Sequence, residues 1–384
     1  MKYTVIGSGM MGSGAAYDLA TRNPGDEVVL ADINIQRANQ AAKAIAANVH
    51  PLRLDVNNPK ELVKALEGSN ALISAVSYSV NYQVTKAAIQ SGVHMCDLGG
   101  NNDVVEKQLT LDADAKEKGV TIIPNCGLAP GLINILAMQG SREFDSLDSI
   151  HLRVGGLPLH PRPPLNYQIV FSVEGLINEY VEKAAVIKDG ELLHIDPMSG
   201  LEDITFPEPF GVLEAFNTSG GLSTLTKLLE GRVKNLDYKT IRYKGHCEKF
   251  KTLLDLGFAT SEPMMVGGSV KTNREFFADL LRKKLDFGDQ DVVLARATIS
   301  GRHGNAEKTL AYEFVDYYDD ATKTTAMMRT TAFPTSIIAQ MLAHGSVDVR
   351  GVMPPELCVD GDAMIQELGK RNLKITKRVT ETWN

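Results

Sequence analysis

The chain opens with the stretch MKYTVIGSGMMGSGAAYDL, residues 1–19, and this stretch decides the fold of its first part. An apolar run, Tyr3–Ile6, leads directly into Gly7, Gly9 and Gly12, which are followed by residues that favour a helix. A strand, a Gly-x-Gly-x-x-Gly turn and a helix make up the dinucleotide-binding motif of Rossmann domains. Gly7 permits the tight turn, Gly9 lets the backbone approach a pyrophosphate, and Gly12 lets helix and strand pack closely.

The same stretch predicts the kind of dinucleotide. Its phosphates are expected at the amino terminus of the helix, at Met10 and Met11, where backbone N–H groups point outward. Asp32 ends the second apolar run, twenty residues after Gly12. A carboxylate there accepts hydrogen bonds from the ribose hydroxyls and repels a 2′-phosphate. Arg37 leaves NADP open, because a guanidinium can pair with that phosphate, but we predict NAD.

Up to about residue 124, short apolar runs alternate with stretches of helix-forming composition. This pattern predicts an α/β fold, a doubly wound parallel sheet with helices on both faces. Ligands of such sheets lie beyond the carboxyl ends of the strands, so Ala75, Val76 and Ser77 are expected beside the cofactor and Asp97 near its nicotinamide. The apolar runs after the first are Val28–Ala31, Leu52–Leu54, Ala71–Val76, Val93–Met95 and Val120–Ile123.

The pattern changes after Pro124, where the chain becomes rich in proline and glycine. The segments Asp291–Ser300 and Thr309–Tyr318 alternate apolar and polar residues across a glycine-containing loop, which predicts a β-hairpin. We therefore expect a second, α+β domain with a mixed or antiparallel sheet, spanning residues 125–334. These long strands also offer a sheet face or edge for subunit pairing.

Composition excludes several classes of function. The 384 residues exceed what one core normally holds, so at least two domains are expected. The net charge of -7, without a block of basic residues, argues against nucleic-acid and membrane-surface partners. The amino terminus runs straight into a strand, and the four cysteines are far apart, so we expect a cytoplasmic protein with reduced thiols. No His or Cys spacing, including that of His160 and His194, predicts a metal site.

Beyond the glycine motif, the sequence contains, in this order, Asp97–Gly100, Cys126–Gly131, the run TIRYKGH at residues 240–246, and Gly351–Glu356. Together these segments resemble the saccharopine dehydrogenase-like family essentially from end to end. The resemblance implies that the chain returns after about residue 334, so that residues 335–384 pack on the nucleotide-binding domain of residues 1–124. It also implies a homo-oligomer built on a dimer.

The chain is compact and lacks the insertion expected of saccharopine reductases. Within the family, this implies NAD-dependent oxidation of the ε-amine of L-lysine to 2-aminoadipate 6-semialdehyde, with release of ammonia. The semialdehyde then cyclises to a piperideine carboxylate. The amine must lose a proton before hydride can leave, and a carboxylate can take that proton. Asp97 is the first candidate base, with a turn cap as its alternative.

The resemblance implies further site residues. Cys126 is expected to line the site, unless it is simply a small buried residue. Gly127 and Pro130 are expected to shape the crossing loop against the nicotinamide, and Tyr78 to close the cofactor mouth.

The substrate's α-carboxylate needs a cation, best a guanidinium. Arg242 is the first candidate and Arg153 the reserve, although an arginine on a strand can also belong to a structural ion pair. Tyr243 and His246 could orient water or substrate, or could equally be packing residues.

Three other functions stay open at this point. A saccharopine-type reductase or dehydrogenase of the same family needs more cations, for which Arg242, Arg153, Arg162 and Lys244 are available. A non-catalytic protein that senses NAD would keep the glycine motif and Asp32 but needs no acid, arginine or histidine in its second domain. A scaffold or interaction subunit would need only the sheet.

Overall fold

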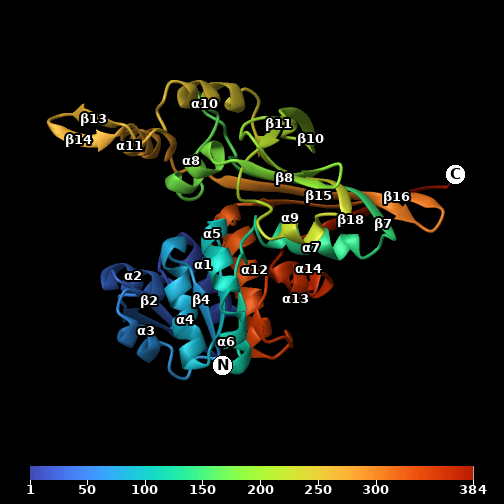
Figure 1. Cartoon of the computed structure of the whole chain (residues 1–384). Coiled ribbons are helices and arrows are strands. Elements are labelled where there is room, and N and C mark those ends of the chain that lie inside the picture. Colours follow the sequence, from blue (N-terminus) through green and yellow to red (C-terminus); the bar gives the residue numbers. More distant parts are fainter. Residues whose placement is uncertain (384) are drawn as a thin grey trace. The chain divides into compact units, whose positions relative to one another are not determined.

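The computed structural model describes residues 1–383, apart from the side chains of residues 266 and 269. The chain divides into two compact units. The first unit combines Met1–Arg142 with Met328–Lys374, and the second combines Glu143–Met327 with the residues from Ile375 on. Each unit is therefore built from two separate segments of the chain, as the sequence colours of Figure 1 show.

The first unit contains a parallel sheet whose strand order is β17-β6-β5-β4-β1-β2-β3. Its central strands are apolar and fully buried, as the non-alternating runs predict. The predicted doubly wound sheet is confirmed, with one strand more than the sequence indicated, because β17 pairs with β6. The strands are β1 (Lys2–Ile6), β2 (Glu27–Asp32), β3 (Val49–Arg53), β4 (Ala71–Ser74), β5 (His94–Asp97), β6 (Thr121–Ile123) and β17 (Gly351–Val352).

The helices of this unit surround the sheet (Figure 1). Gly14 of α1 packs against Ala332 of α12, so the returning segment covers part of the sheet beside α1. The chain's helices here are α1 (Met10–Arg22), α2 (Ile35–Ile45), α3 (Pro59–Ala65), α4 (Asn81–Ser91), α5 (Asn102–Leu109), α6 (Asp112–Glu117), α7 (Leu132–Ser141), α12 (Ala326–Ala343), α13 (Pro355–Cys358) and α14 (Gly361–Gly369), with a 3-10 turn at Tyr78–Val80.

The second unit is built on a mixed sheet with the order β10-β11-β12-β7-β15-β16-β18, to which β8 and β9 add beside β12. Only the pairing of β12 with β7 is parallel among its described strands. The strands are β7 (Ser146–Pro158), β8 (Ala184–Lys188), β9 (Glu191–Ile195), β10 (Glu202–Phe206), β11 (Gly211–Asn217), β12 (Val233–Arg242), β15 (Asp291–His303), β16 (Ala306–Tyr317) and β18 (Thr376–Trp383).

The predicted hairpin is confirmed, since β15 and β16 pair antiparallel across Gly304 and Asn305. A smaller hairpin of β13 and β14, with α11, projects from the sheet of this unit (Figure 1). The helices and the small strands are α8 (Val173–Val181), α9 (Leu225–Leu229), α10 (His246–Asp255), β13 (Pro263–Val266), β14 (Ser269–Thr272) and α11 (Asn273–Leu285).

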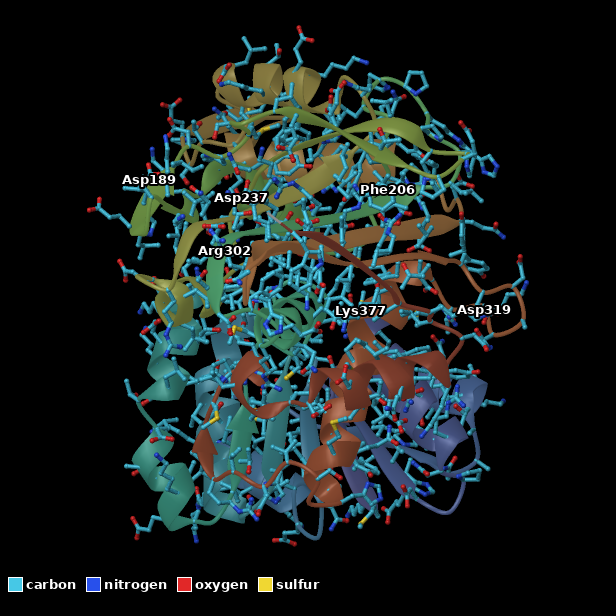
Figure 2. All side chains as sticks on the ribbon, turned by 90° about the vertical axis from the view of Figure 1, so that its right-hand side faces the viewer. Asp189, Phe206, Asp237, Arg302, Asp319 and Lys377 are labelled. Atoms are coloured by element: carbon cyan, nitrogen blue, oxygen red, sulfur yellow. The ribbon has the colours of Figure 1, made fainter. Side chains whose placement is uncertain are left out.

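The last strand corrects the expectation that all of residues 335–384 pack on the nucleotide-binding unit. From Thr376 the chain forms β18, which pairs with β16 in the second unit. Lys377, labelled in Figure 2, bonds to Glu143, and Arg378 bonds to Glu313. Because β18 covers β16, the hairpin strands that we expected to offer an edge for subunit pairing lie inside the sheet.

No helix among residues 1–383 is both long enough and apolar enough to cross a membrane.

Candidate functional site

The glycine turn leaves open space at one position only. A Cβ on Gly7 would lie 2.5 Å from the carbonyl oxygen of Ala75, and one on Gly12 would lie 1.7 Å from that of Gly7. Both glycines are therefore required by close packing. A Cβ on Gly9, the residue before α1, would meet no atom within 4 Å. The turn thus has free space where a dinucleotide pyrophosphate approaches a helix amino terminus, so it fits the predicted cofactor.

Asp32 is buried and is held by the protein itself. Its Oδ2 accepts hydrogen bonds from the backbone and the hydroxyl of Ser8 at 2.7 and 2.8 Å and from Arg37 at 2.7 Å. Its Oδ1 accepts from the backbone N–H of Asn34. Burial raises the pKa of Asp32, but these hydrogen bonds outweigh it and hold that pKa below its usual value. The sequence did not predict Ser8 as a partner of Asp32. It indicated Arg37 only as a group that could pair with a 2′-phosphate, whereas Arg37 is a hydrogen-bond partner of Asp32.

The loop after β4 packs on the glycine turn. Ala75 and Val76 contact Gly7, Ser77 is exposed, and the half-buried ring of Tyr78 lies against Gly100. Ala75 and Val76 therefore adjoin the turn, as their place after a parallel strand implies, whereas the contact of Tyr78 is with Gly100.

Asp97 is fully buried at the end of β5. Its carboxylate accepts hydrogen bonds from the backbone N–H of Gly99 at 2.7 Å and of Asn125 at 3.3 Å, and from the side chain of Gln108 at 2.7 Å. Burial raises the pKa of Asp97, against these hydrogen bonds. This carboxylate joins the loops after β5 and β6, which is the role of a turn cap, the alternative to a base that the sequence left open.

Cys126 lies on the loop after β6 and is fully buried. Its Sγ is 3.2 Å from the carbonyl oxygen of Ile123, and its own carbonyl accepts from the hydroxyl of Thr335. Burial, with Cys96 and Asp97 nearby, raises its pKa, so the thiol stays protonated. In the same loop, Gly131 adopts a positive φ, and a Cβ there would lie 2.2 Å from the carbonyl oxygen of Gly127. Pro130 lies between them.

In the second unit, Arg242 at the end of β12 is buried at 2% exposure and belongs to a hydrogen-bonded chain. Its Nε donates to the Tyr180 hydroxyl at 2.8 Å, and that oxygen is 3.1 Å from Nε2 of His246. Nδ1 of His246 is 2.9 Å from the carbonyl oxygen of Leu165. Because a carbonyl only accepts, Nδ1 carries the proton, and Nε2 accepts from Tyr180.

Most of the Arg242 guanidinium remains available for bonding. Besides Nε, only Nη1 has an acceptor among the described residues, the carbonyl oxygen of Ile241. The guanidinium lies 4.6 Å from the ring centre of Tyr167, whose fully buried hydroxyl has no hydrogen-bond partner among residues 1–383. Unused donors on a buried guanidinium are costly unless a ligand takes them.

The other predicted substrate residues lie elsewhere. Arg153 donates four hydrogen bonds, to Asp237 twice, to Glu202 and to the carbonyl oxygen of Leu152. Asp237 is labelled in Figure 2. Arg153 is thus the structural ion-pair member that the sequence allowed as its alternative. The hydroxyl of Tyr243 donates to the carbonyl oxygen of Pro158, away from the Arg242 cluster.

Sequence reasoning missed Tyr167 and Tyr180, which contact Arg242, and Glu179, which interacts with it electrostatically. No spacing or motif marks them, because they come from the segment around α8, and only the fold brings them to the end of β12.

The first unit thus has the fold and the glycine turn of a dinucleotide-binding Rossmann domain, and the second unit holds a buried guanidinium with unused donors. Residues 3–123 match the family model described as the saccharopine dehydrogenase NADP binding domain. Residues 127–373 match that of the saccharopine dehydrogenase C-terminal domain. The chain belongs to the saccharopine dehydrogenase family, as the motifs of its sequence indicated.

Curated relatives include the mitochondrial alpha-aminoadipic semialdehyde synthase of Mus musculus, 25% identical over 92% of this chain and 45% of that protein. The NADP(+)-dependent, L-glutamate-forming saccharopine dehydrogenase of Pyricularia oryzae is 26% identical over 66% of this chain and 58% of that protein. This chain spans about half the length of these relatives. In fold it is similar to apo saccharopine dehydrogenase (L-Glu forming) from Saccharomyces cerevisiae, with a TM-score of 0.81, 18% identity and 99% of each chain covered.

Proposed function

We propose that the protein is an NAD-dependent L-lysine 6-dehydrogenase, which converts the ε-amine of L-lysine into an aldehyde and ammonia. The observation that carries the choice of substrate is the state of the buried cations of the second unit. Among its described residues these are Arg153, Lys239, Lys308 and Arg242. The first three have carboxylate partners within 4.0 Å, and Arg242 has none. One available buried guanidinium suits a substrate with one carboxylate, as lysine has.

The two units have different roles in the proposed reaction. The first unit would hold the dinucleotide through the Gly7–Gly12 turn and Asp32, and NAD would supply the hydride acceptor there. Arg242 would bind the substrate carboxylate. The ε-ammonium loses a proton to water before the hydride is transferred, water then adds to the iminium, and ammonia leaves as the aldehyde forms. We assign Asp97 the role of holding the loops after β5 and β6 in place, because its three hydrogen bonds already occupy its carboxylate.

The second candidate is a saccharopine dehydrogenase, and it is favoured by the names of the relatives and of the first matched domain. Saccharopine carries more carboxylates than lysine and should need more available cations. Arg162, one of those considered, lies 4.5 Å from the ring centre of Phe287, and Lys244 pairs with Asp203. Neither is buried.

A substrate panel tests the proposal. The purified protein is given L-lysine or saccharopine with NAD or NADP, and reduction of the cofactor and release of ammonia are measured together. We expect reduction of NAD with L-lysine and one ammonia per NADH. Turnover of saccharopine without ammonia, and none of lysine, contradicts the proposal and supports the second candidate. Absence of turnover with both substrates and both cofactors contradicts both.

A further inference from the structure

The strand β18 leaves one of its two edges unpaired. It lies at one end of the sheet of the second unit and pairs with β16 on one side, and no other strand among residues 1–383 pairs with its other side. All eight of its residues, Thr376–Trp383, are exposed. Backbone N–H and C=O groups along such an edge can bind a further strand. The sheet can therefore be extended at β18.

This edge lacks most of the features that keep an edge strand unpaired. Such strands are normally short, bulged or interrupted by proline. β18 is eight residues long, contains no proline and keeps one continuous register with β16. It also exposes two large apolar side chains, Val379 at 46% and Trp383 at 71%. Its charges are of both signs, Lys377 and Arg378 against Glu381, so they do not repel every strand that approaches.

The sequence of β18 is complementary to itself when two copies run antiparallel. In a pairing centred on Val379, Lys377 of each copy stands opposite the partner's Glu381, and the two Val379 side chains stand opposite each other. Pairs of opposite charge and pairs of β-branched side chains both stabilise antiparallel strands. The remaining opposite pairs in this register are Ile375 with Trp383, Thr376 with Thr382, and Arg378 with Thr380.

Neighbouring registers lose this match. Opposite residues in one continuous sheet lie on the same face, so the centre of a symmetric pairing moves from one residue to the next. A centre at Arg378 puts two guanidinium groups opposite each other, which is destabilising. A centre at Thr380 puts Val379 opposite Glu381. The centre at Val379 is thus the register that matches charge with charge and apolar with apolar side chains.

Lys377 and Glu381 have partners within their own chain, but each keeps bonding capacity. Lys377 bonds to Glu143 at 2.5 Å, and Glu381 lies 3.8 Å from Lys308. An ammonium has three donors and a carboxylate has about four acceptor positions, so each group can take a second partner. Their side chains are 42% and 36% exposed. A second strand can therefore join these ion pairs without breaking them.

We propose that β18 is a dimerisation strand, whose free edge pairs antiparallel with β18 of a second copy of this chain. The two-fold axis passes through the pair of Val379 residues, so each Lys377–Glu381 pair occurs twice. The two sheets then form one continuous sheet. The pairing uses no residue of the proposed reaction and is independent of the proposed function. It places the edge for subunit pairing one strand beyond the β15–β16 hairpin.

Charge reversal tests the pairing. Sedimentation velocity of the full chain across a dilution series gives the dissociation constant of the dimer for the wild type, Lys377→Glu and Glu381→Lys. Each variant places like charges opposite each other at two positions, so we expect dimerisation to weaken roughly 10-fold or more. An equal mixture of the two variants should form a mixed dimer about as tightly as the wild type, because opposite charges face each other again at both positions.

Mixing is also the control for damage within each chain. The bond that Lys377→Glu loses to Glu143, or Glu381→Lys to Lys308, stays lost in the mixture. Recovery on mixing therefore reports contact between chains. Trp383 provides an independent signal, because it is the single tryptophan and stands opposite the partner's Ile375 in this register. Its fluorescence should shift to shorter wavelength as the dimer forms.

Disulfide formation tests the register. Under mild oxidation Val379→Cys should give a covalent dimer, because its two copies stand directly opposite each other. Thr380→Cys is the matched control on the same strand. Its two copies are diagonal neighbours about 7–8 Å apart, beyond the reach of a disulfide, so this variant should stay unlinked like the wild type.

Four results overturn the proposal. They are a wild type that stays monomeric throughout the series, a dimer that neither charge reversal weakens, weakened variants that do not recover on mixing, and equal cross-linking of Val379→Cys and Thr380→Cys. None of these measurements needs turnover, so failure of the dimer and failure of the proposed function are recognised separately.

Discussion

Arg242 is linked to the imidazole of His246 through the hydroxyl of Tyr180. Tyr180 accepts from Arg242 and donates its own proton to Nε2 of His246, which accepts only while the imidazole is uncharged. Burial, followed by the charge of Arg242, lowers the pKa of His246 to about 3. We therefore propose that His246 helps to position the guanidinium through Tyr180.

The low pKa of His246 predicts that acid lowers the stability of the folded protein through this one residue. The unfolded chain takes up the proton of His246 near pH 6.5 and the folded chain near pH 3. Between these values the unfolded state binds more protons, so the free energy of unfolding falls with falling pH, by up to about 1.4 kcal/mol per unit from this group. Urea unfolding of the wild type and of His246→Phe, followed at pH 7, 6 and 5, measures the effect.

We expect the stability difference between the wild type and His246→Phe to shrink as the pH falls, because the phenylalanine ring keeps the packing and has no proton to bind. Other groups titrate in both proteins and cancel in the comparison. A difference that stays constant from pH 7 to pH 5 would contradict the assignment of a neutral, buried imidazole.

At the scale of elements, the ends of β1 and β2 and the starts of α1 and α2 meet at Asp32. Ser8 of the glycine turn and Asn34, the residue that caps α2, both donate to its carboxylate. Arg37 of α2 pairs with it while its side chain stays 55% exposed. The acid thus serves as a junction between these elements, and it holds in place Arg37, the cation that NADP would need.

Removing the charge of Asp32 should therefore shift the cofactor preference. In Asp32→Asn, Arg37 loses its carboxylate partner, and a 2′-phosphate loses a repelling neighbour. We expect the ratio of kcat/KM for NAD to that for NADP to fall roughly 10-fold or more, which corresponds to about 1.4 kcal/mol or more. The double variant with Arg37→Ala should lack the gain with NADP. If NADP use rises equally in both variants, Arg37 has no part in the choice of cofactor.

At the scale of the molecule, the first unit is closed by a contact between distant parts of the chain. Asp18 of α1 accepts from Nε of Arg371, just after α14, at 2.7 Å, and from the hydroxyl of Ser336 of α12. Asp18 and Arg371 are both buried, at 2% side-chain exposure. This buried ion pair attaches the returning segment to the nucleotide-binding unit.

Breaking the pair on one side should destabilise the first unit strongly. Asp18→Asn leaves the guanidinium of Arg371 buried with less compensation, and we expect a loss of about 3–5 kcal/mol in the free energy of unfolding. Replacing both residues by apolar ones of similar size, as in Asp18→Leu with Arg371→Met, should cost less than the single change. Thermal and urea unfolding provide the comparison. A single change that costs under about 1 kcal/mol would show that the pair contributes little.

The predictions of fold from sequence succeeded where the fold depends on neighbouring residues. The Gly7–Gly12 turn and Asp32 were recognisable because the strand, the tight turn and the helix start are formed by residues close together in sequence. Their spacing can therefore be seen in the sequence itself. The hairpin of β15 and β16 was equally local.

The tertiary structure alone decided which arginine is available. Arg153 and Arg242 both lie on strands with similar neighbours in sequence, and no local signal separates them. Asp237 and Glu202 take the donors of the first, while the second contacts the neutral side chains of Tyr180 and Tyr167 and, among the described residues, has no carboxylate within 4.0 Å. The physical reason is that burial and charge pairing depend on side chains brought together by sheet order and helix packing, over distances that sequence spacing does not record.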